Sequence, residues 1–299
     1  MFYSDNCSYK QYLKSQGEKT HLKKLYDTIR QFYVFTDDTL RKFETNVDEI
    51  VHKGKNGALK KSTIDLTPLR TKYFFGERYT YGSQNGENGI GSERLYPKNS
   101  VDPIPTWITK GIINPLIEAK ILPKDFVNSV VINDYQPGGC IVSHIDPPHI
   151  FDRPIVSLSL FSDSALCFGC KFHYKPLRCS QPLLKLEMPR GVVTSLSGFA
   201  ANEITHCVRP EDITGRRAVI MMRRVHDCAP RLPQTVVMST MRNISYTDSL
   251  ELTTEDFIKF HQTLLKWQNE GSVVGKIRKR FAKKKDGTTR YSANCYKIV

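Results

Sequence analysis

The most constraining feature of this chain is a succession of short apolar runs between residues 129 and 225, separated by turn-forming residues. IVSLSL, LLKLEM and RRAVIMMRR are examples, and no helical pattern stands between them. Many short strands without intervening helices are typical of an antiparallel sandwich or a jelly roll. We therefore expect this region to be mainly β.

Helices are expected before this region, packed on its outside. Apolar residues recur at helical spacing in three segments, of which the second begins at Thr36-Asp37-Asp38 and ends near Gly54. Residues 1–20 are polar and are expected to be flexible. The apolar positions of the three segments are Leu22, Leu25, Tyr26, Ile29 and Phe32; Leu40, Phe43, Val47, Ile50 and Val51; and Trp107, Ile112 and Ile117.

Length and composition bound the class of protein. A chain of 299 residues with 39% hydrophobic residues can bury one sizeable core and carry extensions. It has no run of about 18 apolar residues, and its first residues lack the apolar centre of a signal peptide. We expect no membrane partner and a nuclear or cytoplasmic location, where its eight cysteines would usually stay reduced.

Positive charge is concentrated at the end of the sequence. The net charge is +14, and residues 276–299 contain nine Lys/Arg and one Asp. Such a run suits a polyanionic partner such as nucleic acid, and a localisation signal or a solubilising end explains it equally well. The preceding segment, residues 253–267, has the pattern of a capped amphipathic helix.

His144-Ile145-Asp146, followed about 60 residues later by His206, is the strongest chemical motif. Two histidines and one carboxylate are the three ligands of non-haem Fe(II) oxygenases, which leave further metal positions open. Side chains two residues apart point to the same face of a strand. The sequence therefore predicts a metal site formed by His144, Asp146 and His206.

Arg217 strengthens this interpretation. It lies eleven residues after His206 in a strand-like run. A 2-oxoglutarate oxygenase needs a guanidinium there, because the far carboxylate of the cosubstrate takes a bidentate partner. Taken singly, each of these residues has an ordinary structural explanation, and their order and spacing together favour the site.

Residues 69–97 combine aromatic and basic residues with a Gly/Asn-rich stretch. This pattern predicts a strand pair with a mobile loop. Aromatic and cationic side chains suit stacking on bases and binding of phosphates. A β-hairpin with a buried aromatic face is the alternative, and it is favoured for Phe74 and Phe75. Lys72, Tyr79 and Tyr81 are better candidates for function.

Residues 133–146 read NDYQPGGCIVSHID, and R-x5-R follows at Arg217 and Arg223. The order N-x-Y, glycine turn, H-x-D, distal His and R-x5-R resembles the AlkB family of Fe(II)/2-oxoglutarate dioxygenases. KYFFGERYTYG, RPIVSLSLFSDSALCFGCKF and EITHCVRP are similar to one branch, which removes the methyl group from N6-methyladenosine in RNA. The resemblance covers about residues 35–230. Val219 and Met221 replace the Asn and Thr of many family members.

The resemblance implies a fold and a role for each matching residue. The fold is a double-stranded β-helix (jelly roll) core with flanking helices. His144, Asp146 and His206 would bind Fe(II), and Lys72 and Tyr79 would be catalytic. The residues implied to bind 2-oxoglutarate are Asn133, Tyr135, Arg217 and Arg223, and those implied to bind substrate are Arg70, Lys72, Tyr79 and Tyr81.

The implied activity is oxidative demethylation of N6-methyladenosine in single-stranded RNA. It would consume O2 and 2-oxoglutarate, release formaldehyde, succinate and CO2, and use ascorbate as reductant. Another methylated base, a protein side chain and a non-enzymatic RNA-binding role are the alternatives. We expect a monomer with a flexible N-terminus (1–20), a dioxygenase domain (21–230) with a nucleotide-recognition lid near 69–97, a C-terminal extension (231–275) and a basic tail (276–299).

Cys167-x-x-Cys170 is weak as a zinc or thioredoxin-like motif, because no second CxxC follows it. The resemblance favours a disulfide between Cys170 and Cys207 that limits access to the site. Free buried thiols are the alternative. His149 and His173 are expected to lie in a loop or strand and not to bind metal.

Overall fold

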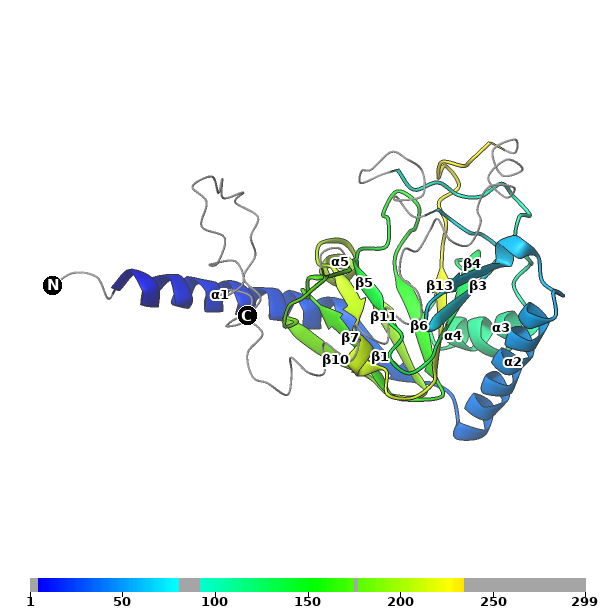
Figure 1. Cartoon of the computed structure of the whole chain (residues 1–299), viewed down its shortest axis with the longest axis horizontal. Coiled ribbons are helices and arrows are strands. Elements are labelled where there is room, and N and C mark those ends of the chain that lie inside the picture. Colours follow the sequence, from blue (N-terminus) through cyan, green and yellow to red (C-terminus); the bar gives the residue numbers. More distant parts are fainter. Residues whose placement is uncertain (1–4, 81–91, 175–176, 234–299) are drawn as a thin grey trace.

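Two antiparallel sheets face each other in the computed structural model, which describes residues 5–80, 92–174 and 177–233 (Figure 1). The larger has seven strands in the order β1-β11-β6-β13-β4-β3-β2, and the smaller has four in the order β10-β7-β12-β5. This arrangement confirms the jelly-roll core predicted from the sequence. A separate hairpin, β8 (Phe172–Tyr174) with β9 (Leu177–Cys179), follows β7.

The strands match the short apolar runs of the sequence closely. The strands of the larger sheet are β1 (Ile29–Tyr33), β11 (Val192–Leu196), β6 (Ile155–Leu160), β13 (Arg217–Arg223), β4 (Ser129–Tyr135), β3 (Arg70–Phe75) and β2 (Ile64–Thr67). Those of the smaller sheet are β10 (Leu184–Met188), β7 (Ser164–Phe168), β12 (His206–Val208) and β5 (Ile141–His144).

Helices cover the outer face of the larger sheet, as expected. Helix α2 (Asp37–Lys55) is capped by Thr36, whose hydroxyl accepts a hydrogen bond from the Thr39 amide at 3.3 Å. The pattern around Trp107 forms α3 (Thr106–Ile108), a π-helical turn (Thr109–Ile113) and α4 (Asn114–Glu118). Apolar side chains of these helices pack with one face of β3, β4, β6 and β13 in the main core cluster.

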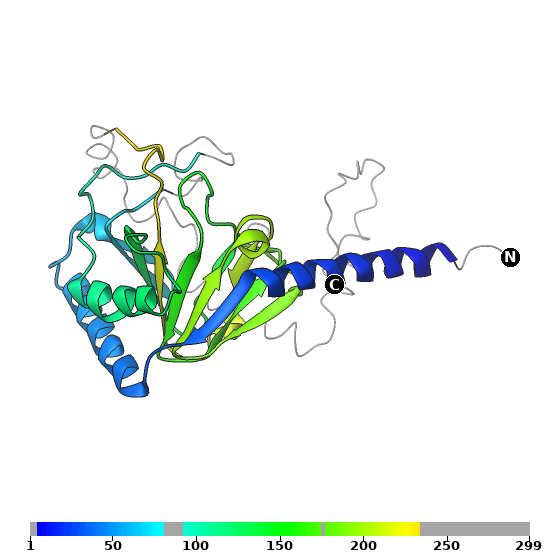
Figure 2. The ribbon, with the colours of Figure 1, turned by 180° about the vertical axis from the view of Figure 1, so that it is seen from behind.

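The first helix differs from the expectation. Helix α1 spans Asp5–Thr28, so residues 5–20 are helical where we expected a flexible segment. Ile29 and Phe32 lie in strand β1 and not in the helix. Tertiary contacts explain the shift, because β1 completes the ladder of β11. The helix projects away from the sheets on the side opposite α2–α4 (Figures 1 and 2).

The end of α1 rests on the short helix α5 (Gly198–Asn202). The His21 ring stacks on Phe199 with 5.4 Å between ring centroids, and the Lys24 ammonium lies 5.2 Å from the same ring. Within the described part of the chain, no helix combines the length and apolarity needed to cross a membrane. The predicted helix at 253–267 and the basic tail lie outside the described residues.

Strand register sets rows of side chains on the inner face of the larger sheet. Arg70, Tyr135 and Arg217 are direct neighbours across β3, β4 and β13. Lys72, Asn133 and Val219 form the next row. Residues directly opposite each other project to the same face. Positions far apart in sequence therefore meet inside the roll.

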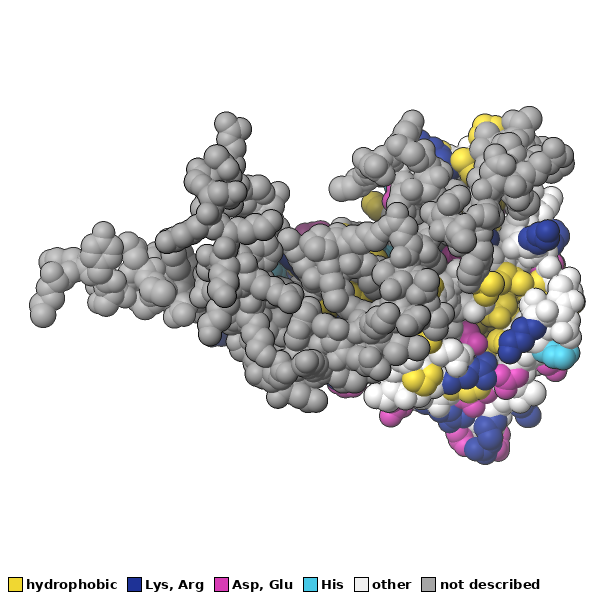
Figure 3. Space-filling view, in the orientation of Figure 1, with side chains coloured by type: hydrophobic (Ala, Val, Ile, Leu, Met, Phe, Trp, Pro, Cys, Tyr) yellow, Lys and Arg dark blue, Asp and Glu magenta, His cyan; other side chains and the backbone are white. Residues whose placement is uncertain are grey.

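The outer surface has a different charge distribution. Around α2 and its neighbours, acidic and basic side chains are interspersed (Figure 3). Arg216, for example, pairs with Asp48 of α2 at 2.6 Å and with Asp134 at 3.0 Å. The charged side chains in the two inner-face rows, Arg70, Lys72 and Arg217, are all basic.

Gly139, in the turn between β4 and β5, permits a close backbone approach. A Cβ atom there would lie 2.4 Å from the Leu69 carbonyl and 2.9 Å from the Gln136 carbonyl. Gly139→Ala should therefore move the start of the strand that carries His144 and lower the free energy of unfolding by about 2 kcal/mol. Urea denaturation tests this. Gly17→Ala, where a Cβ meets nothing within 4 Å, is the control and should be neutral or stabilising.

Candidate metal centre

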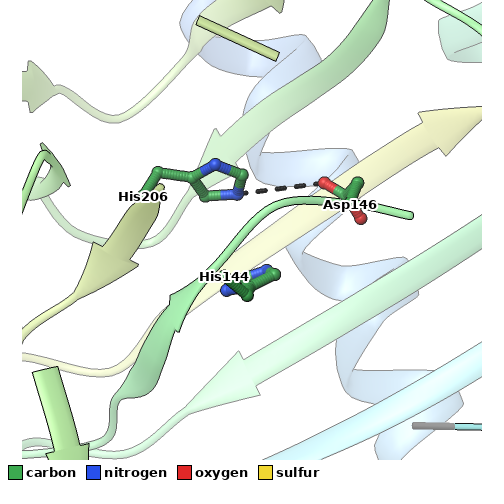
Figure 4. Close-up of side chains that lie close together, drawn as sticks. All are labelled: His144, Asp146 and His206. Carbon is green, nitrogen blue, oxygen red and sulfur yellow. Dashed lines mark ion pairs between the residues drawn. The ribbon is translucent and has the colours of Figure 1, made fainter. Parts of the chain in front are cut away.

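Strand pairing brings the three predicted metal ligands together. His206 of β12 lies directly opposite His144 of β5, and Asp146 follows β5 by two residues. One ligand atom from each residue lies within 4.8 Å of the others. The two imidazole centroids are 4.6 Å apart, and His206 Nε2 is 3.8 Å from Asp146 Oδ2 (Figure 4).

The polar atoms of this cluster fit a metal ion. Asp146 Oδ2 and His206 Nδ1 are buried and have no hydrogen-bond partner. An unpaired carboxylate oxygen is costly to bury, and a metal ion bound by Asp146 Oδ2 would remove that cost. His144 Nδ1 donates to the Val142 carbonyl at 2.8 Å, which fixes the proton there and leaves Nε2 to coordinate. The donor set suits Fe(II), and His206 Nδ1 can carry its own proton when Nε2 binds.

The protonation states also suit metal binding. Burial lowers the pKa of His144, and burial together with His144 lowers the pKa of His206 to about 3. Burial acts to raise the pKa of Asp146, but Arg223 and the two histidines hold that pKa below its usual value. At neutral pH the site therefore holds two neutral imidazoles and one carboxylate, the forms that coordinate a cation.

Two arginines support Asp146. Arg223 Nη1 donates to Asp146 Oδ1 at 3.1 Å, and its guanidinium lies 4.0 Å from the Phe151 ring centroid. Arg153 Nη2 donates to the Asp146 carbonyl at 2.7 Å and to Ala201 at 3.1 Å. Arg153 Nε also binds Asn202 Oδ1 at 2.8 Å, so one side chain ties the ligand turn to α5.

No pattern in the sequence indicated the role of Arg153. It lies outside the H-x-D and R-x5-R patterns, and only the distance of seven residues from Asp146 connects it with the site. Arg223 contacts Asp146, one of the three predicted metal ligands. Its direct contact with 2-oxoglutarate stays a prediction.

Arg217 has the surroundings of an anion-binding residue. Its Nη2 donates to Ser159 Oγ at 3.3 Å, while its buried Nε and Nη1 have no hydrogen-bond partner. Burial lowers the pKa of this guanidinium, and nearby Tyr135 opposes that effect. A carboxylate would fill the two unpaired donors with the planar geometry that Arg prefers. These features fit the predicted cosubstrate anchor.

Asn133 and Tyr135 lie beside Arg217, as the register requires. The Tyr135 ring stands between two guanidinium groups, 5.7 Å from that of Arg70 and 5.5 Å from that of Arg217. Asn133 Nδ2 contacts Met221 Sδ at 3.6 Å. Both residues are buried on the inner face, where hydrogen-bond donors can reach a bound anion.

Two of the residues expected to bind substrate, Lys72 and Tyr79, are buried. Lys72 is 3% exposed and forms an ion pair with Asp65, its partner across the β2–β3 hairpin. Tyr79 is 6% exposed and packs edge-on against Phe151 with 5.0 Å between ring centroids. Tyr81 lies outside the described residues. The side chains of Lys72 and Tyr79 therefore lie inside the protein and not on its surface.

Asp65 and Arg78 complete the polar group around Lys72. Arg78 Nη2 lies 3.7 Å from Asp65 Oδ1, and its guanidinium lies 5.1 Å from the Phe74 ring. Burial lowers the pKa of Lys72 to about 7; Asp65 opposes this shift and Arg70 adds to it. Asp65 lies before the segment 69–97 in which the sequence predicted a strand pair, so no sequence pattern indicated its place in this group.

The cysteines form a cluster of thiols beside the metal centre. Cys140, Cys167, Cys170, Cys179 and Cys207 pack around Phe172, and all are free thiols. Cys170 and Cys207 are in contact, as the implied disulfide requires, and the disulfide between them stays a prediction. His149 lies 3.4 Å from Glu93 and is not part of the metal cluster, and the side chain of His173 lies outside the described residues.

Comparison with known proteins gives a close match in sequence. The rat protein named RNA demethylase ALKBH5 is 54% identical over 235 residues, which are 78% of this chain and 60% of that protein. The Xenopus tropicalis protein of the same name is 55% identical over 218 residues, 73% of this chain and 61% of that protein. The chain thus spans about 60% of the length of these curated relatives.

More distant matches are weaker. Arabidopsis RNA demethylase ALKBH9B is 30% identical over 182 residues, 58% of this chain and 35% of that protein. A solved structure of OsALKBH1 matches with a TM-score of 0.42 and 14% identity, over 66% of this chain and 96% of that one. No family model matches the chain. The close sequence relatives agree with the resemblance seen in the motifs.

Removal of one ligand should abolish tight metal binding. We expect His206→Ala to weaken Mn²⁺ binding by more than about 100-fold, since loss of even an outer partner of a metal ligand costs 10–100-fold. Anaerobic titration calorimetry measures the affinity. His149→Ala, which alters a histidine outside the cluster, should bind normally. Unchanged affinity in His206→Ala would place the ion elsewhere.

Lys72 should make stability depend on pH. Its pKa is about 7 in the folded chain and about 10.5 when unfolded. Between these values the unfolded chain binds more protons, so the contribution of Lys72 to stability rises with pH. The free energy of unfolding of the parent protein relative to Lys72→Met should increase from pH 7 to 10. Lys61→Met, which removes an exposed lysine, is the control variant.

Proposed function

We propose that this protein is an Fe(II)- and 2-oxoglutarate-dependent oxygenase that demethylates N6-methyladenosine in single-stranded RNA. The observation that carries the proposal is the convergence of His144, Asp146 and His206 with the buried, partly unpaired guanidinium of Arg217. The names of the vertebrate relatives support RNA as the substrate. The choice of N6-methyladenosine rests on the motifs shared with that branch of the family.

The three ligands would hold Fe(II), and Arg217 would bind the distal carboxylate of 2-oxoglutarate. Bound iron, with 2-oxoglutarate and O2, supplies the oxidation of the N-methyl carbon; the hydroxylated methyl group then leaves as formaldehyde, with succinate and CO2 as the other products. Ascorbate would keep the iron reduced. Arg223 would hold the Asp146 carboxylate in place as a ligand, and Arg153 would hold the backbone of the same residue.

The inner face of the larger sheet, across from His144 and His206 of the smaller sheet, would receive the base. Arg70 and Lys72 project from β3 on the inner face, in the same rows as Tyr135 and Asn133. A lysine with a pKa of about 7 can hold or release a proton at neutral pH, which suits a group that acts on the N6 atom or on its hydroxymethyl product. Tyr79, packed against Phe151 and Arg223, would shape the pocket nearest the metal.

An unpaired base must leave its stack to reach a buried centre, and single-stranded RNA makes this cheapest. We also propose that the protein acts as a monomer and that its basic tail supports nuclear localisation and RNA binding. In the described part of the chain, Lys72 and Arg78 lie around the single carboxylate of Asp65, and basic side chains of this kind suit a polyanionic substrate better than a neutral peptide. This difference favours RNA over a protein side chain.

Nucleoside mass spectrometry tests the proposal directly. The full chain is incubated with N6-methyladenosine RNA, Fe(II), 2-oxoglutarate and ascorbate, and conversion to adenosine is expected together with equimolar formaldehyde and succinate. Other methylated bases and a methylated peptide serve as competitors. RNA binding without turnover would favour a non-enzymatic binding module, and turnover of a competitor alone would change the substrate.

Arg217→Lys tests whether 2-oxoglutarate binding needs the guanidinium group of Arg217 or only its positive charge. A lysine keeps the positive charge but loses the planar pair of donors. We expect the KM for 2-oxoglutarate to rise about 10- to 100-fold, the equivalent of one charge-assisted hydrogen bond, with metal affinity unchanged. Arg216→Lys, at the outward-facing neighbour, is the matched control. An unchanged KM in Arg217→Lys would assign the anchor to another residue.

A further inference from the structure

Cys170 contacts two other thiols at once. Its Sγ lies 3.9 Å from Cys179 Sγ and donates to the Ser180 carbonyl at 3.0 Å. It also contacts the thiol of Cys207, the residue next to His206. Cys170 and Cys207 are fully buried, whereas Cys179 is half-buried and gives the cluster access to solvent.

The two neighbours of Cys170 come from different elements. The β8–β9 hairpin places Cys179 opposite Phe172, and hydrogen bonds between Lys171 and Ser180 hold the hairpin closed near Cys170. Cys207 is carried by β12, the strand of the distal metal ligand. The fold therefore presents one thiol to two alternative partners.

We propose that Cys170 is an oxidisable thiol that forms a disulfide with Cys179 as an alternative to one with Cys207. A sulfur atom makes only one such bond, so the two links exclude each other. The Cys207 link would tie the end of β7 to the strand of the metal ligand. The Cys179 link would instead close the hairpin upon itself and leave β12 unlinked.

Hydrogen peroxide is the oxidant in this proposal. One thiol reduces peroxide and becomes a sulfenic acid, with release of one water. The sulfur of the second thiol attacks the sulfenic sulfur, the S–S bond forms, and a second water leaves with its proton. Two electrons pass in total from the two sulfurs to the O–O bond.

The surroundings favour Cys170 over its neighbour Cys167. Hydrogen bonds from Cys179 and Cys207 lower the pKa of Cys170, with a smaller contribution from Arg209. Burial raises the pKa of Cys167 to about 12, and its thiol donates to Asp212 Oδ2 at 3.4 Å. A thiol held protonated in this way is a poor nucleophile.

Peptide mapping after mild oxidation tests the proposal. The full chain is treated with limiting peroxide and a chelator, alkylated without reduction and digested with trypsin, which does not cut before proline. Peptides 179–185 and 191–216 then each contain a single cysteine, while peptide 125–171 contains Cys140, Cys167 and Cys170. We expect 125–171 to be linked to 179–185 in one product and to 191–216 in another.

Variants identify the thiols. Cys170→Ser should lose both linked products, and Cys179→Ser should keep only the link to 191–216, in increased yield. Cys228→Ser, at an exposed cysteine outside the cluster, should change neither. Absence of any link to 179–185 in the parent protein, or its survival in Cys170→Ser, would overturn the proposal. The assay contains no RNA or cosubstrate, so its outcome is independent of the proposed demethylase activity.

Discussion

The ion pair between Arg223 and Asp146 is the interaction on which the candidate site depends, because it joins the two sheets at the metal centre. Arg223 ends β13 of the larger sheet, and Asp146 follows β5 of the smaller one. Both side chains are almost fully buried and are 3.1 Å apart. Removal of one partner from a buried pair costs about 3–5 kcal/mol, since the other charge is left in the interior. The pair therefore aligns the sheets as well as the metal ligand.

Buried cations give the interior its chemical character. Lys72, Arg78, Arg217 and Arg223 are buried, and the ion pairs that the described residues form with them involve Asp65 and Asp146. Their burial is costly in the isolated chain, because it disfavours the charged form of each group. The shifted pKa of Lys72 and the unpaired donors of Arg217 are two expressions of this cost. The proposed ligands would relieve it, because 2-oxoglutarate is a dicarboxylate and RNA carries a phosphodiester backbone.

The thiol cluster lies directly behind the metal ligand His206. Strand β12 pairs with β5 on one side and with β7 on the other, and it carries both His206 and Cys207. A displacement of Cys207 would therefore also displace the His206 imidazole. A covalent link at Cys207 would stiffen this strand, and a link at Cys179 would not. Which thiol is bonded to Cys170 would therefore decide how rigidly β12 holds His206.

The sequence by itself determined the mainly β architecture and the boundaries of α2, because both depend on the local periodicity of apolar residues. It also identified His144, Asp146 and His206 as metal ligands, because residues two apart on a strand point to the same face. It also indicated Arg217, whose place six residues before Arg223 fixes both on one strand face. Only the tertiary structure decided that residues 29–33 form an edge strand, because their partner β11 lies more than 150 residues away in sequence. It also decided that Lys72 and Tyr79 face the interior, that Arg153 holds the metal-ligand turn, and that Cys170 has two neighbouring thiols. Each of these depends on cross-strand register and burial, which no local pattern of residues encodes.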